Sequence, residues 1–161
     1  MKKKLVLFGF VVLSIGLIAL YYNKKAEDVL NITSADEKQA QTTELNAEEK
    51  KVKKVLEENI AAATAKDSER YVNTLTKAKR AETKKEMDKF FKEYTVVHSL
   101  QSFQVLKEDK THMLVEAKQK AINKGKKSYR NHIATADHTF VKENGEWKID
   151  STTMTDTQFL E

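Results

Sequence analysis

Residues 140–149 read FVKENGEWKI, and this stretch decides the fold. The dipeptide Asn144-Gly145 stands between two short runs with apolar residues at alternating positions, which is the strongest short-range signal of a β-hairpin. In the second run, Trp147 and Ile149 share one side of the strand. The sequence therefore predicts that the chain folds back on itself here as two antiparallel strands joined by a tight turn.

The same period of two extends upstream of this hairpin. The alternation predicts four strands, at residues 95–108, 112–123, 129–142 and 147–153. Residues 124–127, Lys-Gly-Lys-Lys, form the expected turn between the second and third strands. A slip in the alternation between Leu100 and Phe103 predicts a β-bulge. The tail after Met154 is ambiguous.

Before residue 95 the apolar residues follow the period of a helix. Asn46 is a good N-cap, and Glu48 and Glu49 suit the positive end of the helix dipole. Single apolar stripes predict three helices, at residues 46–66, 67–75 and 82–94. The expected fold class is α+β, with three N-terminal helices packed on a curved, cone-shaped four-stranded antiparallel sheet and preceded by one transmembrane helix.

Residues 1–23 predict a signal anchor. Leu5 to Tyr22 contains no charged residue and, as a helix, spans about 27 Å, close to the thickness of a bilayer core. The three lysines before this block predict a cytoplasmic N-terminus and an extracytoplasmic domain in the cell membrane of a bacterium. The alternative is a cleaved signal and a secreted protein, which the bulky and basic residues 20–25 disfavour.

The rest of the chain divides into a linker and one domain. Residues 24–45 are polar without sustained periodicity and predict a juxtamembrane linker, whereas residues 46–161 form the α+β domain. The absence of cysteine excludes a disulfide scaffold and a thiolate metal site. We expect no metal, no cofactor and no nucleic-acid partner, because no HExxH motif and no glycine-rich phosphate loop occurs and the net charge of +5 is modest.

The order of these elements resembles the nuclear-transport-factor-2-like superfamily, also called cystatin-like or SnoaL-like. The resemblance is carried by FVKENGEWKI at residues 140–149 and by Ala65-Lys66-Asp67 before Tyr71, and it covers residues 46–154. The superfamily includes ketosteroid isomerases, scytalone dehydratases and polyketide cyclases, as well as non-catalytic binding domains fused to membrane anchors. The resemblance implies the second group for this chain, because its architecture includes a predicted anchor.

Candidate ligand-binding residues are those expected to line the cone: His98, His132, Asp137, His138 and Trp147. His132 and His138 share a face but lie about 20 Å apart along one strand, so they cannot share a metal ion there. Asp137 lies on the other face of that strand, and the alternation leaves open which face lines the cavity. We expect no catalytic residue. The alternatives to a ligand-binding role are that Asp137 is an ordinary surface carboxylate and that Trp147 anchors the core.

The small net charge conceals an uneven distribution. Residues 107–130 hold eight basic and three acidic side chains, whereas residues 131–161 hold two basic and six acidic ones. Lys124, Lys126 and Lys127 form the centre of a basic surface patch. This patch predicts contact with anionic wall polymer or lipid headgroups, with a merely solubilising role as the alternative.

The sequence as a whole predicts a membrane-anchored, extracytoplasmic accessory protein. Its domain is expected to bind a small ligand or an envelope protein without catalysis, and to form a homodimer through its sheet. One alternative is a small isomerase or dehydratase that uses a carboxylate or histidine in the cone. Another is a structural subunit of a cell-envelope assembly.

Overall fold

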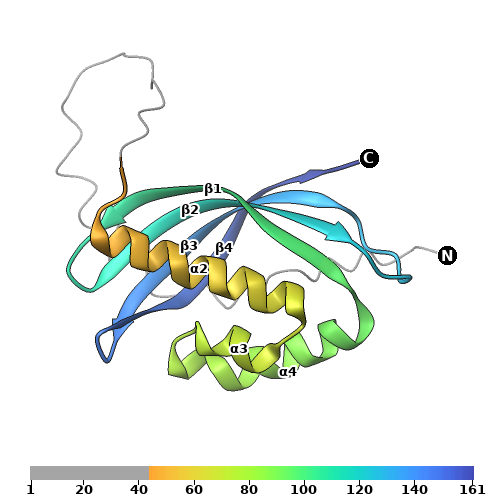
Figure 1. The fold of residues 1–161 in the computed structure, drawn as a ribbon, viewed down its shortest axis with the longest axis horizontal. Helices are drawn as coiled ribbons and strands as arrows, with labels where there is room; N and C mark the ends of the chain where they lie inside the picture. Colours follow the sequence, from red (N-terminus) through yellow and green to blue (C-terminus); the bar gives the residue numbers. More distant parts are fainter. Residues whose placement is uncertain (1–43) are drawn as a thin grey trace, which may run out of the picture. The chain divides into compact units, whose positions relative to one another are not determined.

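The computed structural model of the chain describes residues 44–161 (Figure 1). The predicted signal anchor, residues 1–23, and nearly all of the predicted linker, residues 24–45, lie outside this part. Within residues 44–161, the helices are too short or too polar for any of them to cross a membrane.

Three helices precede the sheet, as predicted: α2 (Ala47–Ala65), α3 (Ser68–Asn73) and α4 (Lys77–Glu93). Asn46 and Glu49 form a capping box at the start of α2, because the Asn46 side chain accepts the Glu49 N–H and the Glu49 carboxylate accepts the Asn46 N–H. The helix ends at Lys66, whose φ of 59° is left-handed, and Asp67 then caps α3.

The start of α4 differs from the prediction by five residues. The helix begins at Lys77 rather than near residue 82, although Thr76 makes no side-chain cap bond. The Lys77 N–H instead donates to the carboxylate of Glu143, at 3.1 and 3.2 Å to its two oxygens. A distant residue therefore supplies the cap, and no local sequence signal could reveal it.

Four strands form one antiparallel sheet in the order β1-β2-β3-β4, as predicted: β1 (Val96–Glu108), β2 (His112–Asn123), β3 (His132–Glu143) and β4 (Glu146–Phe159). Asn144 and Gly145, with φ of 55° and 83°, make the two-residue turn between β3 and β4. The register shifts between Leu100 and Ser102, which confirms the bulge.

Two strand boundaries correct the prediction. β3 begins at His132 rather than at residue 129, because Asn131 uses its side chain to accept the Asn123 N–H and holds a loop there. β4 continues to Phe159, well beyond residue 153, because the ambiguous tail pairs with the first half of β3 and places Phe159 opposite His132.

The helices cover one face of the curved sheet, and the core lies between the two layers (Figure 1). Val52 and Leu56 of α2 meet Val115 of β2 and Phe140 of β3, and all four are fully buried. On β3, every second residue from His132 to Phe140 is buried, so these side chains define the inner face of the sheet. Residues between them lie on the outer face.

Candidate functional site

A cavity of about 20 Å³ lies between the helices and the sheet. Its polar lining consists of Asn59, Tyr71, His98 and Gln119, and its apolar lining of Ile60, Ala63, Met87 and Phe90. A single water molecule needs at least about 10–15 Å³, whereas sites for small-molecule ligands occupy about 300–1,000 Å³. The cavity therefore has room for about one water molecule.

His138 lies in the core beside this cavity and is 2% exposed. Its Nε2 lies 3.1 Å from the Gln119 amide nitrogen, which donates, so the His138 Nδ1–H donates to Thr152 Oγ1 at 2.9 Å. Burial lowers the pKa of His138 to about 4, so the ring is neutral at pH 7. Both ring nitrogens are thus satisfied by the protein, and neither is free to serve as a base.

His98 and His132 lie at the other end of the inner face. Both stand in register with Ala121 of β2, one on each side of it, and the small alanine lets their rings approach. Burial, and then the neighbouring His132, lower the pKa of His98 to about 4. The His132 Nδ1–H donates to the carbonyl of Arg130 at 2.9 Å. The structure thus brings His98 and His132 together and leaves His138 apart.

Asp137 does not line the cone. It lies on the outer face, between Glu116 of β2 and Thr153 of β4 in register. Burial, and then the charge of Glu116, raise the pKa of Asp137. Its Oδ1 is buried and has no hydrogen-bond partner among the described residues. The carboxylate therefore cannot act on a molecule in the cone, and its environment disfavours its charged form.

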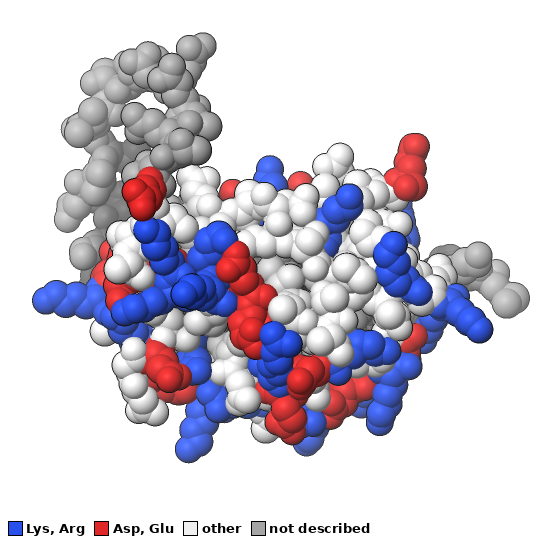
Figure 2. All heavy atoms as spheres, viewed as in Figure 1, with Lys and Arg blue, Asp and Glu red and all other residues white. Residues whose placement is uncertain are grey.

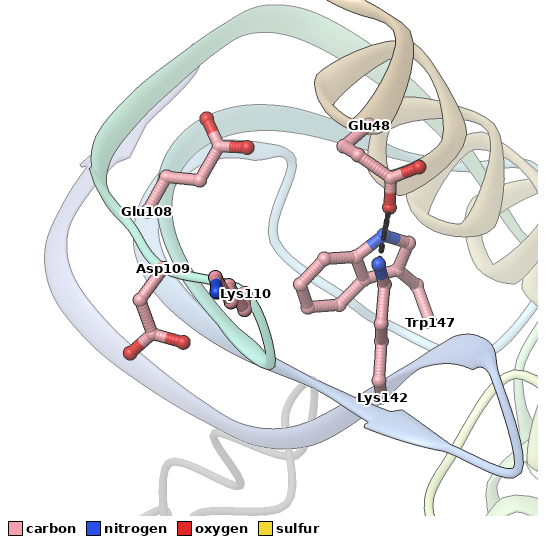
Figure 3. Close-up of a pocket in the computed structure, with 6 residues that line it drawn as sticks. All are labelled: Glu48, Glu108, Asp109, Lys110, Lys142 and Trp147. Atoms are coloured by element: carbon pink, nitrogen blue, oxygen red, sulfur yellow. Dashed lines mark hydrogen bonds and ion pairs between the residues drawn. The ribbon is translucent and has the colours of Figure 1, made fainter.

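Trp147 is held at the opposite end of the inner layer from His132 and is 4% exposed. Its Nε1–H donates to Glu48 of α2 at 2.7 Å, and Lys142 and Lys51 donate to the same carboxylate at 2.7 and 2.6 Å. These donors, with Lys142 the strongest, lower the pKa of Glu48 to about 2. Figure 3 shows Glu48, Trp147 and Lys142 converging where the first turn of α2 meets the β3–β4 hairpin.

An open groove of about 600 Å³ lies beside this cluster, bounded by Glu108, Asp109 and Lys110 of the β1–β2 turn (Figure 3). The turn residues already serve the fold: Asp109 accepts N–H groups of its own turn, and Glu108 accepts the Asn46 side-chain amide at 3.1 Å. The Lys142 ammonium covers the indole of Trp147, 4.9 Å from a ring centroid. Trp147 is therefore a core anchor with one polar contact, not an open stacking platform.

The predicted basic residues lie in the exposed loop between β2 and β3. Among the described residues, no carboxylate forms a salt bridge with Lys124 or Lys126. The Lys127 ammonium pairs with Glu93 and lies 4.6 Å from the ring centroid of Tyr94. Arg130 stacks at 3.6 Å on the ring of Phe159. The loop thus combines cations with partly exposed aromatic rings.

Sequence reasoning missed Gln119, Asn59 and Thr152, which satisfy the polar groups inside the cone. Gln119 had a usable signal, because it occupies an inner position in the alternation of β2 between Ala117 and Ala121. Thr152 had none, since only the register of β4 places it opposite His138. Within residues 44–161, no three His, Asp or Glu side chains are grouped to hold a metal ion.

A family model described as "Anti-sigma-I factor RsgI9, C-terminal domain" matches residues 54–160. No curated protein matches the chain in sequence. The match therefore covers α2 from Lys54 onward, the other two helices and the whole sheet.

Solved structures share the fold at low sequence identity. A Nostoc punctiforme protein of unknown function with a cystatin-like fold is 14% identical, with a TM-score of 0.59 over 70% of this chain and 93% of that chain. A nuclear-transport-factor-2-like protein of unknown function from Pseudomonas putida is 10% identical, with a TM-score of 0.58 over 67% and 85%. A type 2 hexachlorocyclohexane dehydrochlorinase is 10% identical, with a TM-score of 0.54 over 71% and 90%. These similarities confirm the predicted superfamily fold, which enzymes and proteins of unknown function share.

Proposed function

The chain belongs to the family of anti-sigma-I factor RsgI9 C-terminal domains, and from this premise we propose that it is a regulatory accessory protein whose domain binds another protein without catalysis. The family name assigns its parent protein to the control of a sigma factor. We assign this chain to the same kind of control. Its partner is then a protein of that regulatory system, met on the surface of the domain.

One observation supports the non-catalytic part of the proposal: the cavity lined by His98 and Gln119, between the helices and the sheet, is small. The cavity of about 20 Å³ is far smaller than a substrate site. His138, the most deeply buried histidine, is hydrogen-bonded at both ring nitrogens to Gln119 and Thr152. A general acid or base needs a free atom within reach of a substrate, and both ring nitrogens of His138 already have partners among the described residues.

The location of the protein is part of the proposal. The apolar block at residues 5–22 and the lysines before it support a membrane-anchored protein with an extracytoplasmic domain. In that arrangement the regulatory partner is an envelope protein, and residues 24–45 give the domain its reach. A structural role in an envelope assembly is the second candidate, favoured by the same anchor.

The enzyme alternative makes a different demand on the cone. It needs the ionisable groups that face the cavity, His98 and Tyr71. The double variant His98→Leu, Tyr71→Phe removes both groups and keeps apolar bulk in their place. A protein-binding domain tolerates this exchange, because its function lies on the surface.

The experiment compares cells that express the full chain, no chain, or the double variant at equal abundance, and measures sigma-factor-dependent transcription. We expect transcription to change when the chain is absent and to return to its normal level with either version. Unchanged transcription without the chain would refute a role in sigma-factor control. A folded double variant that does not restore transcription would refute the non-catalytic role.

A further inference from the structure

The loop between β2 and β3, residues 124–131, lies at the opposite end of the sheet from the β1–β2 turn (Figure 1). Residues 117–136 around this loop contain six Lys or Arg and no Asp or Glu. Figure 2 shows basic side chains at the end of the visible face where the loop lies, beside a broad uncharged area, whereas both signs are mixed along the helices. The loop is therefore a local concentration of positive charge.

Hydrogen bonds hold the backbone of this loop in place. The Lys124 N–H donates to the Thr95 carbonyl at 2.8 Å. The Asn123 side chain accepts the Gly125 N–H at 2.9 Å and donates to the Lys127 carbonyl at 3.0 Å. A side-chain carbon at Gly125 would lie 3.2 Å from the Thr95 nitrogen, so the two segments approach closely here. The loop thus presents its cations from an ordered backbone, which reduces the entropy lost on binding.

Most of the cations of the loop are not neutralised within the domain. Among the described residues, no carboxylate forms a salt bridge with three of them, Lys124, Lys126 and Arg130. Two acidic residues lie at this end. Glu93 pairs with Lys127, and Glu161 follows Leu160, whose N–H donates to the Asn131 carbonyl at 2.8 Å. The cations outnumber these acidic residues, so the loop keeps a net positive charge that an external anion can bind.

Apolar and aromatic side chains flank these cations. Val97 on β1 is 39% exposed, which is high for a large hydrophobic side chain in this domain. It stands in register with Ile122, two residues before the loop, and both side chains lie on the outer face of the sheet. On the helix side of the loop, the rings of Tyr94 and Tyr129 lie 5.6 Å apart between centroids, and both are partly exposed. The cations therefore have an apolar pair on one side and a tyrosine pair on the other.

From this combination we propose that the β2–β3 loop docks the domain on the surface of an anionic lipid bilayer. Lys124, Lys126 and Arg130 bind the lipid phosphates. Val97 and Ile122 enter the apolar boundary below the headgroups, and the tyrosine rings lie at the headgroup level, where such rings are enriched. A polyanion of the wall would need the cations alone, whereas the exposed valine gains free energy only in an apolar phase.

This inference rests on the membrane location that is part of the proposed function. The 22 residues of the segment 24–45 span at most about 75 Å even when fully extended, so the predicted anchor keeps the domain near the bilayer. At such a local concentration a weak contact suffices, and each cation at an anionic surface adds about fivefold to its affinity. Glu116 lies on the outer face six residues before Ile122 and repels an anionic surface, so the loop end of the domain makes the contact.

A polarity-sensitive dye on a single introduced cysteine tests the docking, since the natural chain has no cysteine. The full chain with Ser128→Cys carries the dye at an exposed position within the loop. Lys110→Cys carries it in the exposed β1–β2 turn at the other end of the sheet and is the matched control. Both labelled chains are reconstituted into vesicles of phosphatidylcholine alone, or of phosphatidylcholine with about one third phosphatidylglycerol.

We expect the emission of the dye on Ser128→Cys to rise several-fold in the anionic vesicles and to fall again in molar salt, because salt screens the attraction. The emission from Lys110→Cys is expected to be the same in both kinds of vesicle. Adding Lys124→Glu and Lys126→Glu to Ser128→Cys is expected to abolish the rise. Equal emission from Ser128→Cys in neutral and anionic vesicles, or an equal rise from Lys110→Cys, would overturn the proposal.

Val97 separates a bilayer from wall polymer as the bound surface. Adding Val97→Ser to Ser128→Cys is expected to reduce the rise by about twofold or more, because less apolar area is buried. Leu106→Ser changes an equally exposed apolar residue at the far end of β1 and is expected to leave the rise unchanged. The fluorescence of Trp147 verifies that both variants are folded. A rise that Val97→Ser does not reduce would indicate anions bound without insertion, as wall polymer would be, and would overturn the bilayer assignment.

The anchor and the docking are measured separately. Flotation of the full chain with phosphatidylcholine vesicles tests the predicted anchor, because these vesicles offer the loop no net charge. The response of the dye to anionic lipid decides the docking whether or not the chain floats. The transcription experiment that tests the regulatory function is independent of both measurements.

Discussion

Replacing His138 with glutamine is expected to weaken the dependence of stability on pH. His138 has a pKa of about 4 in the folded protein, against about 6.5 for an unfolded histidine. Because the unfolded chain binds the proton more readily, the stabilisation is fully present above pH 6.5 and is lost as the pH falls toward 4. Between pH 7 and pH 5, linkage gives a loss of about 2 kcal/mol from this one group.

The assay is urea unfolding of the full chain in detergent at pH 7 and pH 5, followed by the fluorescence of Trp147, the single tryptophan. His138→Gln can be less stable than the natural chain at both pH values, so the decisive quantity is the difference between them. We expect this difference to shrink by about 2 kcal/mol in the variant. His98 titrates in the same direction and keeps part of the dependence in place.

His112→Gln is the matched control, because this side chain lies at the surface at the start of β2 with about half of it exposed. It is expected to leave the difference between pH 7 and pH 5 nearly as large as in the natural chain. If His138→Gln shows the same difference as the natural chain, the ring is not held neutral by burial. The inference that His138 is buried as a neutral ring with both nitrogens hydrogen-bonded would then be wrong.

Three further changes test other parts of the structure. Glu48→Gln is expected to lower the urea midpoint at pH 7, because it removes the charge that binds Lys51 of α2 and Lys142 of β3. The natural carboxylate loses this contribution to stability only below about pH 4.5, as the pH falls toward its folded pKa of about 2. Asp137→Asn is expected to raise the free energy of unfolding by up to about 1 kcal/mol, because it removes a like-charge contact across two strands. The triple change of Lys124, Lys126 and Lys127 to Ala is expected to abolish salt-sensitive binding to anionic vesicles or to isolated wall polymer.

Each of these changes has a control on the surface of the same domain. Glu82→Gln and Asp156→Asn alter exposed carboxylates and are expected to leave the free energy of unfolding unchanged within about 0.5 kcal/mol. Removal of Lys79, Lys85 and Lys89 from α4 changes the net charge as much as the loop variant does. Equal loss of binding in both triple variants would show that net charge, not the loop, is recognised.

Local sequence signals predicted the elements whose ends are fixed by neighbouring residues. Asn46 caps α2 through Glu49, three residues away, and Asn144-Gly145 closes a two-residue turn by itself. The start of α4 could not be predicted in this way, because its cap is the carboxylate of Glu143 on β3. The end of β4 could not be predicted either, because the polar tail has no apolar alternation and becomes a strand through its pairing with β3.

The candidate site was harder to predict than the fold for a related reason. Alternation along β3 separates Asp137 from His132 and His138, but only the position of the helices decides which set is inside. The helices cover the face of the two histidines, so Asp137 is left on the outer face beside Glu116. The β-bulge at Gln101 was visible in the sequence, yet the register with β2 is needed to show that Leu100 and Phe103 lie on the same face.

The polar side chains inside the cone have partners within the protein itself. A catalytic cone needs a polar atom left without a protein partner and a space in front of it. In this chain Gln119 and Thr152 occupy the two ring nitrogens of His138, and Asn59 donates to Thr74 at 2.7 Å, so these polar side chains stabilise the core through one another. Met87 and Phe90 line the small cavity beside these side chains. On the outside of the described domain, the uncharged residues 96–106 of strand β1 and the basic loop before β3 differ in chemistry from the mixed charges of the other surfaces.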